Sequence, residues 1–358
     1  MWNFAELFVS LTLQCTILLT VTLFMTRWQK NHQTRDLLWS SCHAMILLLC
    51  AIGLLLPHLR LWVINGRLTQ ILTAASGWSA LIMVIWSVGA LLMTAGITMA
   101  LIQSSRLVMS SEPVERSLRE RIGAVVPAEF TIAVHPDIQT PFCWQFHRPA
   151  IVLPEYVLEF PEDELSAILR HEAGHLRFGH PFRLFLQRLV EVIFWFHPLV
   201  WAMSRRAALQ REIVSDEAAA GNREEATVLL RSLWRNAETQ ERRGARSLAL
   251  PAGLAFAERG QMLQIRINEL VGRSTSQSAV AGYSPYPPMM LVACGVVCTS
   301  LWVPLTPGAT PRSWFSPWPE NSASLLRVFG ISVRDYEIDA TLLREQNHGG
   351  MPPADEPQ

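Results

Sequence analysis

The chain has almost no lysine, because Lys30 is the only one among 358 residues. No serine is followed three residues later by a lysine, which excludes a serine–lysine acylation centre anywhere in the sequence. Charged residues are also scarce, at 17% of the total, and no segment gathers them into the basic patch that nucleic-acid binding requires. We therefore expect no direct contact with DNA or RNA.

The six cysteines do not form a disulfide framework. Five of them lie inside long apolar segments, and Cys143 stands alone in a more polar part of the chain. A small secreted domain held together by disulfides is therefore not expected.

Half of the residues are hydrophobic, and many of them gather in uncharged segments. Residues 7–26, 37–59 and 80–102 each have about the ~20 residues that a helix needs to cross the hydrocarbon core of a membrane. A fourth apolar segment, residues 289–306, follows a run of prolines, and a buried core helix is the alternative for it. The pattern predicts an α-helical membrane bundle of four spans.

Four spans divide the chain into residues 1–105 with three transmembrane helices, 106–285 as an inserted domain, 286–306 as the fourth transmembrane helix, and 307–358 as a short tail. The loop after the first span carries Arg27, Lys30 and Arg35, and such cations favour the cytoplasmic side of the membrane. The loop after the second span carries two arginines as well, which weakens this assignment. We expect the inserted domain in the cytoplasm and the tail outside.

The inserted domain begins with strand patterns and continues with helical ones. Three short stretches rich in β-branched and aromatic residues, FTIAVHP, PFCWQF and AIVLP, are separated by turn sequences and predict a small antiparallel sheet. From Pro161 an acidic first turn is followed by apolar residues at helical spacing, and this helix is expected to stop near Gly179. The domain is therefore of the α+β class.

The predicted helix contains the sequence HEAGH, with His171 and His175 one turn apart and Glu172 beside the first histidine. At this spacing both imidazoles reach one metal ion, and the pattern is typical of a tetrahedral zinc site with one position left for water. Glu172 is then the general base that takes a proton from water during attack on a peptide carbonyl. Two ligands are too few for catalytic zinc, so an exposed polar helix face stays open as an alternative.

A third ligand is expected on the helical segment that ends near Gly221. Glu212 and Asp216 lie four residues apart on it. Taken alone, such a pair is more typical of a solvated helix face. Together with the first helix it supplies a carboxylate ligand and an acceptor for the other ring nitrogen of a metal-bound histidine.

Three blocks of the sequence resemble the membrane-bound zinc metallopeptidases of the BlaR/MecR antirepressor type: PFCWQFHRPAIVLP, LSAILRHEAGHLRFGHP, and FWFHPLVW leading into REIVSDEA. The resemblance runs from about Pro141 to Ala220, and the four-span layout extends it over most of the chain. It implies a gluzincin-like HExxH domain with His171, His175 and Glu212 as zinc ligands, Glu172 as the base and Asp216 in the second-helix motif. It also implies a bacterial inner (plasma) membrane location.

The chain departs from this family at Gln145, which stands at a usual glycine, at His180, where aspartate is common, and at Ser215, where cysteine is common. None of the three is a ligand, so the departures affect only the groups that orient the histidines. Receptors of this family also carry a penicillin-binding sensor domain after the fourth span, and its serine–lysine chemistry is excluded here. We expect the transducing half without that sensor, and a separate sensor protein as a partner.

Residues 184–203, between the two metal helices, are apolar but interrupted by Arg188, Glu191 and His197. Because charges are costly at the centre of a lipid-facing helix, we expect a hairpin that dips into the membrane interface or packs against the bundle. A buried core helix is the alternative.

Related receptors are activated by a cut between the metal helices and the fourth span. The polar run around Arg242, Arg243 and Gly244 is the corresponding site here, and an arginine-rich loop that faces anionic lipid is the plain alternative.

These features predict an integral membrane zinc endopeptidase, and the resemblance implies that it cleaves itself or a cytoplasmic winged-helix repressor in signalling. A non-catalytic signalling scaffold that retains the fold is the alternative from another class, and the retained Glu172 is an argument against it. An intramembrane or prenyl-protein protease with the same motif would have more spans than four.

Overall fold

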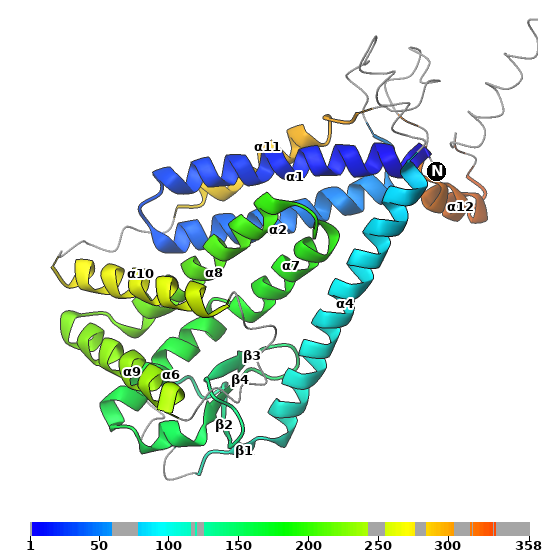
Figure 1. The fold of residues 1–358 in the computed structure, drawn as a ribbon. Coiled ribbons are helices and arrows are strands. Elements are labelled where there is room, and N and C mark those ends of the chain that lie inside the picture. Colours follow the sequence, from blue (N-terminus) through cyan, green and yellow to red (C-terminus); the bar gives the residue numbers. More distant parts are fainter. Residues whose placement is uncertain are drawn as a thin grey trace, which may run out of the picture. The chain divides into compact units, whose positions relative to one another are not determined.

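The computed structural model describes residues 2–58, 78–115, 119, 125–242, 255–275, 284–303, 316, 318–331 and 333. Two compact units share these residues. The first contains Met1–Phe24, Ser41–Leu91 and Tyr286–Gln358, and the second contains Met25–Ser40 and Leu92–Pro285. Three long helices cross from one unit to the other: α1 (Trp2–Trp28), α2 (His32–Leu55) and α4 (Ser79–Ser110) (Figure 1).

The three predicted N-terminal spans are confirmed as long apolar helices. Residues Phe4–Trp28, His32–Leu55 and Ser79–Ser110 are each long and apolar enough to cross a membrane. Within the first unit, Glu6 is buried, and its carboxylate accepts a hydrogen bond of 2.7 Å from Trp302 Nε1. A polar group is therefore satisfied inside an apolar bundle, where an unpaired one would cost several kcal/mol, on the order of 2–7.

The fourth predicted span has become a shorter helix. The helix α11 (Tyr286–Cys298) has 13 residues, which gives a length of about 20 Å against about 30 Å of hydrocarbon core. It packs closely in the first unit, because a Cβ atom at Gly295 would overlap the side chain of Met45 on α2. The four-span bundle is not confirmed, and three candidate spans are found among the residues that the structure describes. The tail contributes α12 (Glu320–Val328).

The predicted strands are present, but the sheet is mixed rather than antiparallel. It contains β1 (Glu112–Pro113), β2 (Thr131–His135), β3 (Phe142–Trp144) and β4 (Ala150–Pro154), in the order β1-β2-β4-β3. β2 and β4 are parallel, whereas the other two pairs are antiparallel. After β2 the chain passes to the edge of the sheet, where it forms β3, and then returns as β4 between β2 and β3. All five residues of β4 are buried, as expected for a central strand.

The helix α6 (Glu162–Arg177) lies at the centre of the second unit and packs against α8 (Pro198–Ala219) and α9 (Arg223–Arg242). As the sequence predicts, it starts with three acidic residues that favour the positive end of the helix dipole. One side joins the core with β4 through buried residues that include Ile151, Leu153, Ile168 and Leu169. The chain leaves α6 at Gly179, whose φ of 67° suits glycine.

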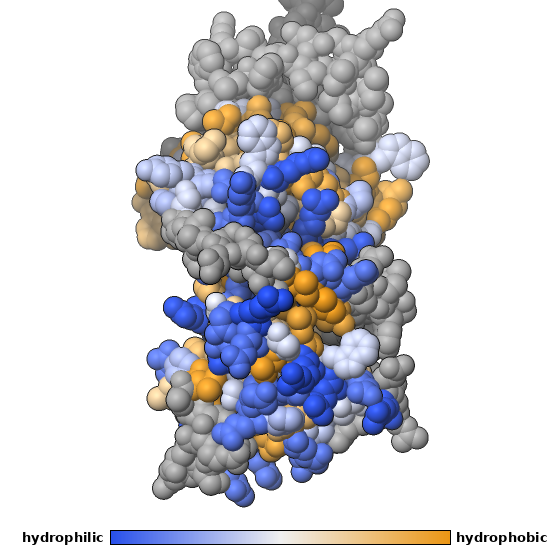
Figure 2. All heavy atoms as spheres, turned by 90° about the vertical axis from the view of Figure 1, so that its left-hand side faces the viewer, coloured by the Kyte–Doolittle hydropathy of each residue, from blue (hydrophilic) through white to orange (hydrophobic). Residues whose placement is uncertain are grey.

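The segment between the metal helices forms a helical hairpin, as predicted. The helix α7 (His180–Ile193) ends before the turn at residues 194–197, and Pro198 then begins α8. Because the chain turns at residues 194–197, this segment is not one continuous helix, and α7 has both exposed side chains, such as Leu184, and buried ones, such as Val190. The next helices are α9 and α10 (Ala255–Thr275). Figure 2 shows hydrophilic side chains interspersed with hydrophobic ones on one face, and α9 carries exposed charges such as Arg223, Glu224 and Arg231.

Candidate metal centre

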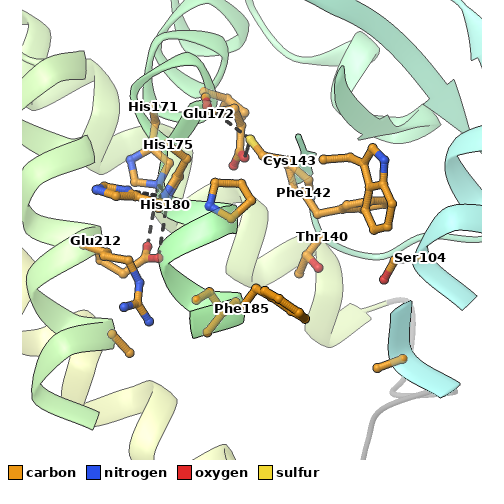
Figure 3. Close-up of a pocket in the computed structure, with 18 of the residues that line it drawn as sticks. Ser104, Thr140, Phe142, Cys143, His171, Glu172, His175, His180, Phe185 and Glu212 are labelled. Atoms are coloured by element: carbon orange, nitrogen blue, oxygen red, sulfur yellow. Dashed lines mark hydrogen bonds and ion pairs between the residues drawn. The ribbon is translucent and has the colours of Figure 1, made fainter. Parts of the chain in front are cut away.

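The helix α6 places His171 and His175 on one face. Their Nε2 atoms lie 3.1 Å apart, although the two residues are four positions apart in the chain. Both nitrogens therefore point toward one place, which Figure 3 shows at the wall of a cavity. Such convergence of two ring nitrogens is typical of imidazoles arranged for a shared cation.

The helix α8 adds Glu212 to the two histidines. Its Oε2 atom lies 3.6 Å from His171 Nε2, and its Oε1 atom lies 3.6 Å from His175 Nε2. The helices approach closely here because α6 has Gly174 at the crossing, where an added Cβ atom would lie 3.4 Å from the Cα atom of Ser215. The predicted third ligand thus joins the predicted first two, with all three ligand atoms within 4.8 Å of one another.

The distances fit a zinc ion. With bonds of about 2.0–2.2 Å, two ligands of a tetrahedral zinc lie roughly 3.3–3.6 Å apart. The three separations in this centre are 3.1, 3.6 and 3.6 Å. Two imidazole nitrogens and one carboxylate also form a ligand set that zinc commonly takes.

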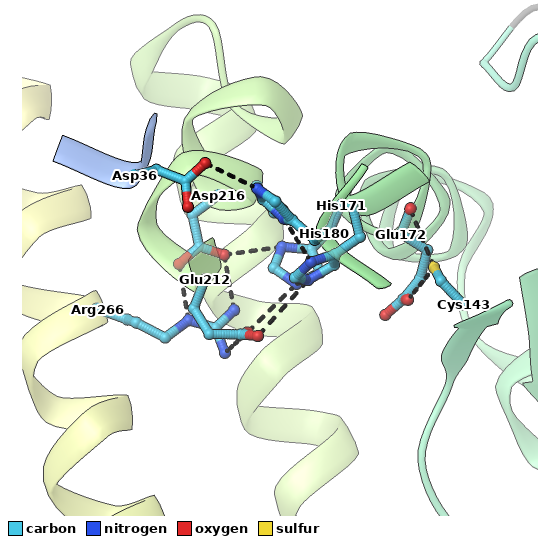
Figure 4. A network of polar contacts seen from close by, with 10 residues as sticks. Asp36, Cys143, His171, Glu172, His180, Glu212, Asp216 and Arg266 are labelled. Atoms are coloured by element: carbon cyan, nitrogen blue, oxygen red, sulfur yellow. Dashed lines mark hydrogen bonds and ion pairs between the residues drawn. The ribbon is translucent and has the colours of Figure 1, made fainter. Parts of the chain in front are cut away.

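Glu172 points away from the three ligands and toward β3. Its Oε2 atom accepts a hydrogen bond of 2.9 Å from Cys143 Sγ (Figure 4). Burial raises the pKa of Glu172, with His171 and the Cys143 hydrogen bond acting in the opposite direction. A raised pKa suits a carboxylate that takes up a proton during a reaction. Burial, together with the neighbouring Glu172 carboxylate, holds the pKa of the Cys143 thiol well above its usual range, so this thiol is a donor and not a thiolate.

Asp216 lies one turn after Glu212 and contacts the other ring nitrogen of His171. Its Oδ1 atom is 2.9 Å from His171 Nδ1. This contact fixes the ring so that Nε2 faces the ligand cluster, which is the role that the sequence predicts for an outer carboxylate. Burial alone would raise the pKa of Asp216, but Arg266 and His171 hold it below its usual value.

Arg266 on α10 is a further member of the centre. Its Nε and Nη2 atoms donate hydrogen bonds of 2.7 Å to the two oxygens of Asp216, and its Nη1 atom lies 3.0 Å from Glu212 Oε2. No local sequence pattern distinguishes Arg266 from the other arginines, so it was not predicted. The only signal is indirect, since two carboxylates buried together need a cation.

The second histidine has a different outer contact. His175 Nδ1 lies 2.9 Å from His180 Nδ1, and His180 Nε2 lies 3.4 Å from Asp36 Oδ2. Asp36 belongs to the first turns of α2 and was likewise not predicted.

The charges of the centre favour a cation. Burial lowers the pKa of His175 to about 3, whereas hydrogen bonds with Asp216 and Glu212 outweigh burial and raise the pKa of His171 to about 10. Although burial acts in the opposite direction, His175 and His171, with Arg266, hold the pKa of Glu212 well below its usual value. Since a histidine binds a metal with an unprotonated nitrogen, a metal must displace a proton from His171.

A cavity of about 720 Å³ adjoins the centre (Figure 3). Apolar side chains from several elements line much of it, including Leu101 on α4, Phe142 on β3 and Phe185 on α7. Glu172 and the ligand cluster lie in its wall. Because β3 is an edge strand, its free backbone groups can pair with an extended peptide in this space.

The expected self-cleavage region lies at the limit of the described chain. Arg242 is the last residue of α9, exposed, and forms an ion pair with Glu238. Arg243 and Gly244 lie outside the described residues.

Two histidines, a carboxylate from a neighbouring helix and an adjacent glutamate form the arrangement of a metallopeptidase-type hydrolase. Residues 63–228 match a family model described as BlaR1 peptidase M56. An 83-residue stretch is 34% identical to the "Regulatory protein BlaR1" of Bacillus licheniformis, which is 23% of this chain and 14% of that protein. Residues 63–228, which are less than half of the chain, are therefore similar to the BlaR1 peptidase M56 family, and this supports a likeness to proteins of the BlaR1/MecR type.

Proposed function

We propose that the protein is an integral membrane zinc endopeptidase that acts in transmembrane signalling. The observation that carries the proposal is the convergence of His171, His175 and Glu212, with Glu172 beside them but directed elsewhere. A non-catalytic signalling scaffold would not need the buried carboxylate of Glu172 to be kept apart from the three metal-ligand candidates.

In this proposal the two histidines and Glu212 hold the ion, while Asp216 and Arg266 orient the ligands. Zinc bound there supplies Lewis acidity toward a peptide carbonyl and lowers the pKa of water toward neutrality. Glu172 takes the proton from the attacking water and passes it to the leaving amine. The apolar walls of the cavity exclude bulk water, and the free edge of β3 aligns the substrate backbone.

The substrate that we propose is a protein segment in extended form. Candidates are the chain itself, near Arg243, and a cytoplasmic winged-helix repressor. Similarity to a regulatory protein supports a role in signalling. We place the protein in a bacterial plasma membrane, with residues 106–285 in the cytoplasm and residues 286–306 as a fourth span.

Metal analysis combined with a peptide cleavage assay tests the proposal. The purified protein is expected to contain about one zinc per chain and to cleave a peptide library in a chelator-sensitive way. His171→Ala and Glu212→Ala should lose both zinc and cleavage. As a control, His197→Ala removes a histidine from the α7–α8 turn and should keep both. Full zinc and full cleavage in Glu212→Ala would refute the ligand assignment.

A further inference from the structure

The side chains of His175, His180 and Asp36 form a buried chain of polar contacts that leads away from the ligand cluster. The first contact is 2.9 Å between the two Nδ1 atoms, and the second is 3.4 Å from His180 Nε2 to Asp36 Oδ2 (Figure 4). His180 is 3% exposed and Asp36 is 2% exposed, so water does not replace either contact.

Only one arrangement of protons satisfies this chain when His175 Nε2 faces a metal. The proton of His175 must then be on Nδ1, where it is donated to His180 Nδ1. His180 consequently carries its own proton on Nε2, the atom that faces Asp36. That nitrogen is buried and makes no hydrogen bond of ordinary geometry within the described part of the chain, and the Asp36 carboxylate, 3.4 Å away, is the acceptor that faces it.

The two histidines of the centre are therefore oriented by different means. Asp216 contacts the ring of His171 directly, at 2.9 Å. For His175, the imidazole of His180 lies between the His175 ring and the carboxylate of Asp36. Ser215, the residue before Asp216, places its Oγ atom 3.3 Å from the same His180 Nδ1.

Asp36 is held in place from two sides. Arg183, one turn after His180 on α7, forms an ion pair with Asp36 Oδ2. One turn before Asp36 on α2, the ring of His32 is 2.8 Å from Gln210 Nε2 on α8. The first turn of α2 is thus attached to both α7 and α8, which fixes the carboxylate relative to His180.

We infer that His180 and Asp36 are positioning residues that hold His175 in the tautomer and ring orientation needed to bind the metal. This inference rests on the proposed function, because it takes His175 as a ligand. Neither residue touches the metal or the substrate. Outer contacts of this kind change metal affinity about 10- to 100-fold when they are removed.

Zinc affinity of the full-length protein, measured by competition with a chelating dye in detergent, tests the inference without using activity. His180→Ala and Asp36→Ala should each weaken zinc binding about 10-fold or more. Asp36→Asn retains an oxygen acceptor without the charge, so its loss should be smaller. His197→Ala is the matched control for a buried histidine on the same hairpin and should bind zinc as the wild type does.

A rescue experiment separates positioning from a merely structural role. The variant His180→Asp places a carboxylate where it can accept directly from His175, so Asp36 is no longer needed. We expect Asp36→Ala to weaken zinc binding in the wild type but not in the His180→Asp background. An equal loss in both backgrounds would overturn the relay.

The failure of this inference and the failure of the proposed function give different results. If His171→Ala leaves zinc binding intact, the zinc centre itself is wrong. If His171→Ala abolishes binding while His180→Ala and Asp36→Ala stay within about twofold of the wild type, which is well below the expected loss, the relay alone is wrong.

Discussion

Replacing Arg266 with alanine leaves two carboxylates of the metal centre without the guanidinium that contacts both. Asp216 loses two hydrogen bonds of 2.7 Å, and Glu212 loses an ion pair of 3.0 Å. The side chain of Asp216 is 2% exposed, so water cannot take the place of the guanidinium, whereas that of Glu212 is 32% exposed and partly screened. Removing one partner of a buried ion pair costs about 3–5 kcal/mol, and we expect the lower end here.

The loss should depend on zinc. Without metal, Arg266→Ala leaves His171 as the one cation among the described residues that contacts both carboxylates, whereas a bound divalent cation adds two positive charges beside them. At about 2–4 °C per kcal/mol, a loss of about 3 kcal/mol lowers the Tm of the metal-free protein by roughly 10 °C. Saturating zinc should therefore raise the Tm of Arg266→Ala by several degrees more than it raises that of the wild type.

Thermal unfolding in detergent, with chelator and with zinc, measures this difference. Arg235→Ala is the matched control, since Arg235 forms two hydrogen bonds with the buried Glu164 away from the metal ligands. Its Tm should respond to zinc as the wild type does. Equal zinc-dependent shifts in wild type and Arg266→Ala would refute the placement of Arg266 in the electrostatics of the centre.

Two other predictions rest on single contacts, and a third concerns the expected self-cleavage region. Gly174→Ala places a Cβ atom 3.3 Å from that of Ala218, so it should separate α6 from α8 and destabilise the protein by about 1–3 kcal/mol. Gly272→Ala is the control, because an added Cβ atom there meets open space and should not destabilise the protein. Chemical unfolding measures the stability of both variants. The hydrogen bond from Cys143 lowers the pKa of Glu172, so this pKa should rise in Cys143→Ala. The acid limb of the pH profile of kcat/KM should then move to higher pH. Cys143→Ser keeps a hydrogen-bond donor and should leave the acid limb near its original position. A C-terminally tagged chain should yield a fragment that starts near Gly244, seen by mass spectrometry, and the same fragment in Glu172→Gln would point to another protease.

More of the candidate site than of the surrounding structure could be predicted from the sequence. His171, Glu172 and His175 follow from one helical turn, and Glu212 with Asp216 from another, because i, i+4 spacing fixes which side chains share a face. Their convergence depends on the approach of α6 and α8 at Gly174, which no local pattern encodes.

Other features depend on contacts between distant segments. β2 and β4 pair in parallel because β3 lies at the edge of the sheet. The sequence patterns of three short strands do not indicate the order of the strands in the sheet. Asp36 and Arg266 come from helices far from the motif and have no distinguishing neighbours in the sequence. The apolar segment after residue 288 predicted a full span, but the described helix ends at Cys298.

The most direct test of the proposed peptidase activity measures both zinc content and peptide cleavage in the Glu172→Gln variant. Glu172 lies outside the three-ligand group and is hydrogen-bonded to Cys143, so the amide should leave zinc at about one per chain. It should abolish cleavage, because an amide cannot take a proton from water. Retained zinc with lost cleavage is the predicted result. Cleavage at the wild-type rate, or a loss of zinc equal to that in His171→Ala, would contradict the assignment of ligands and base.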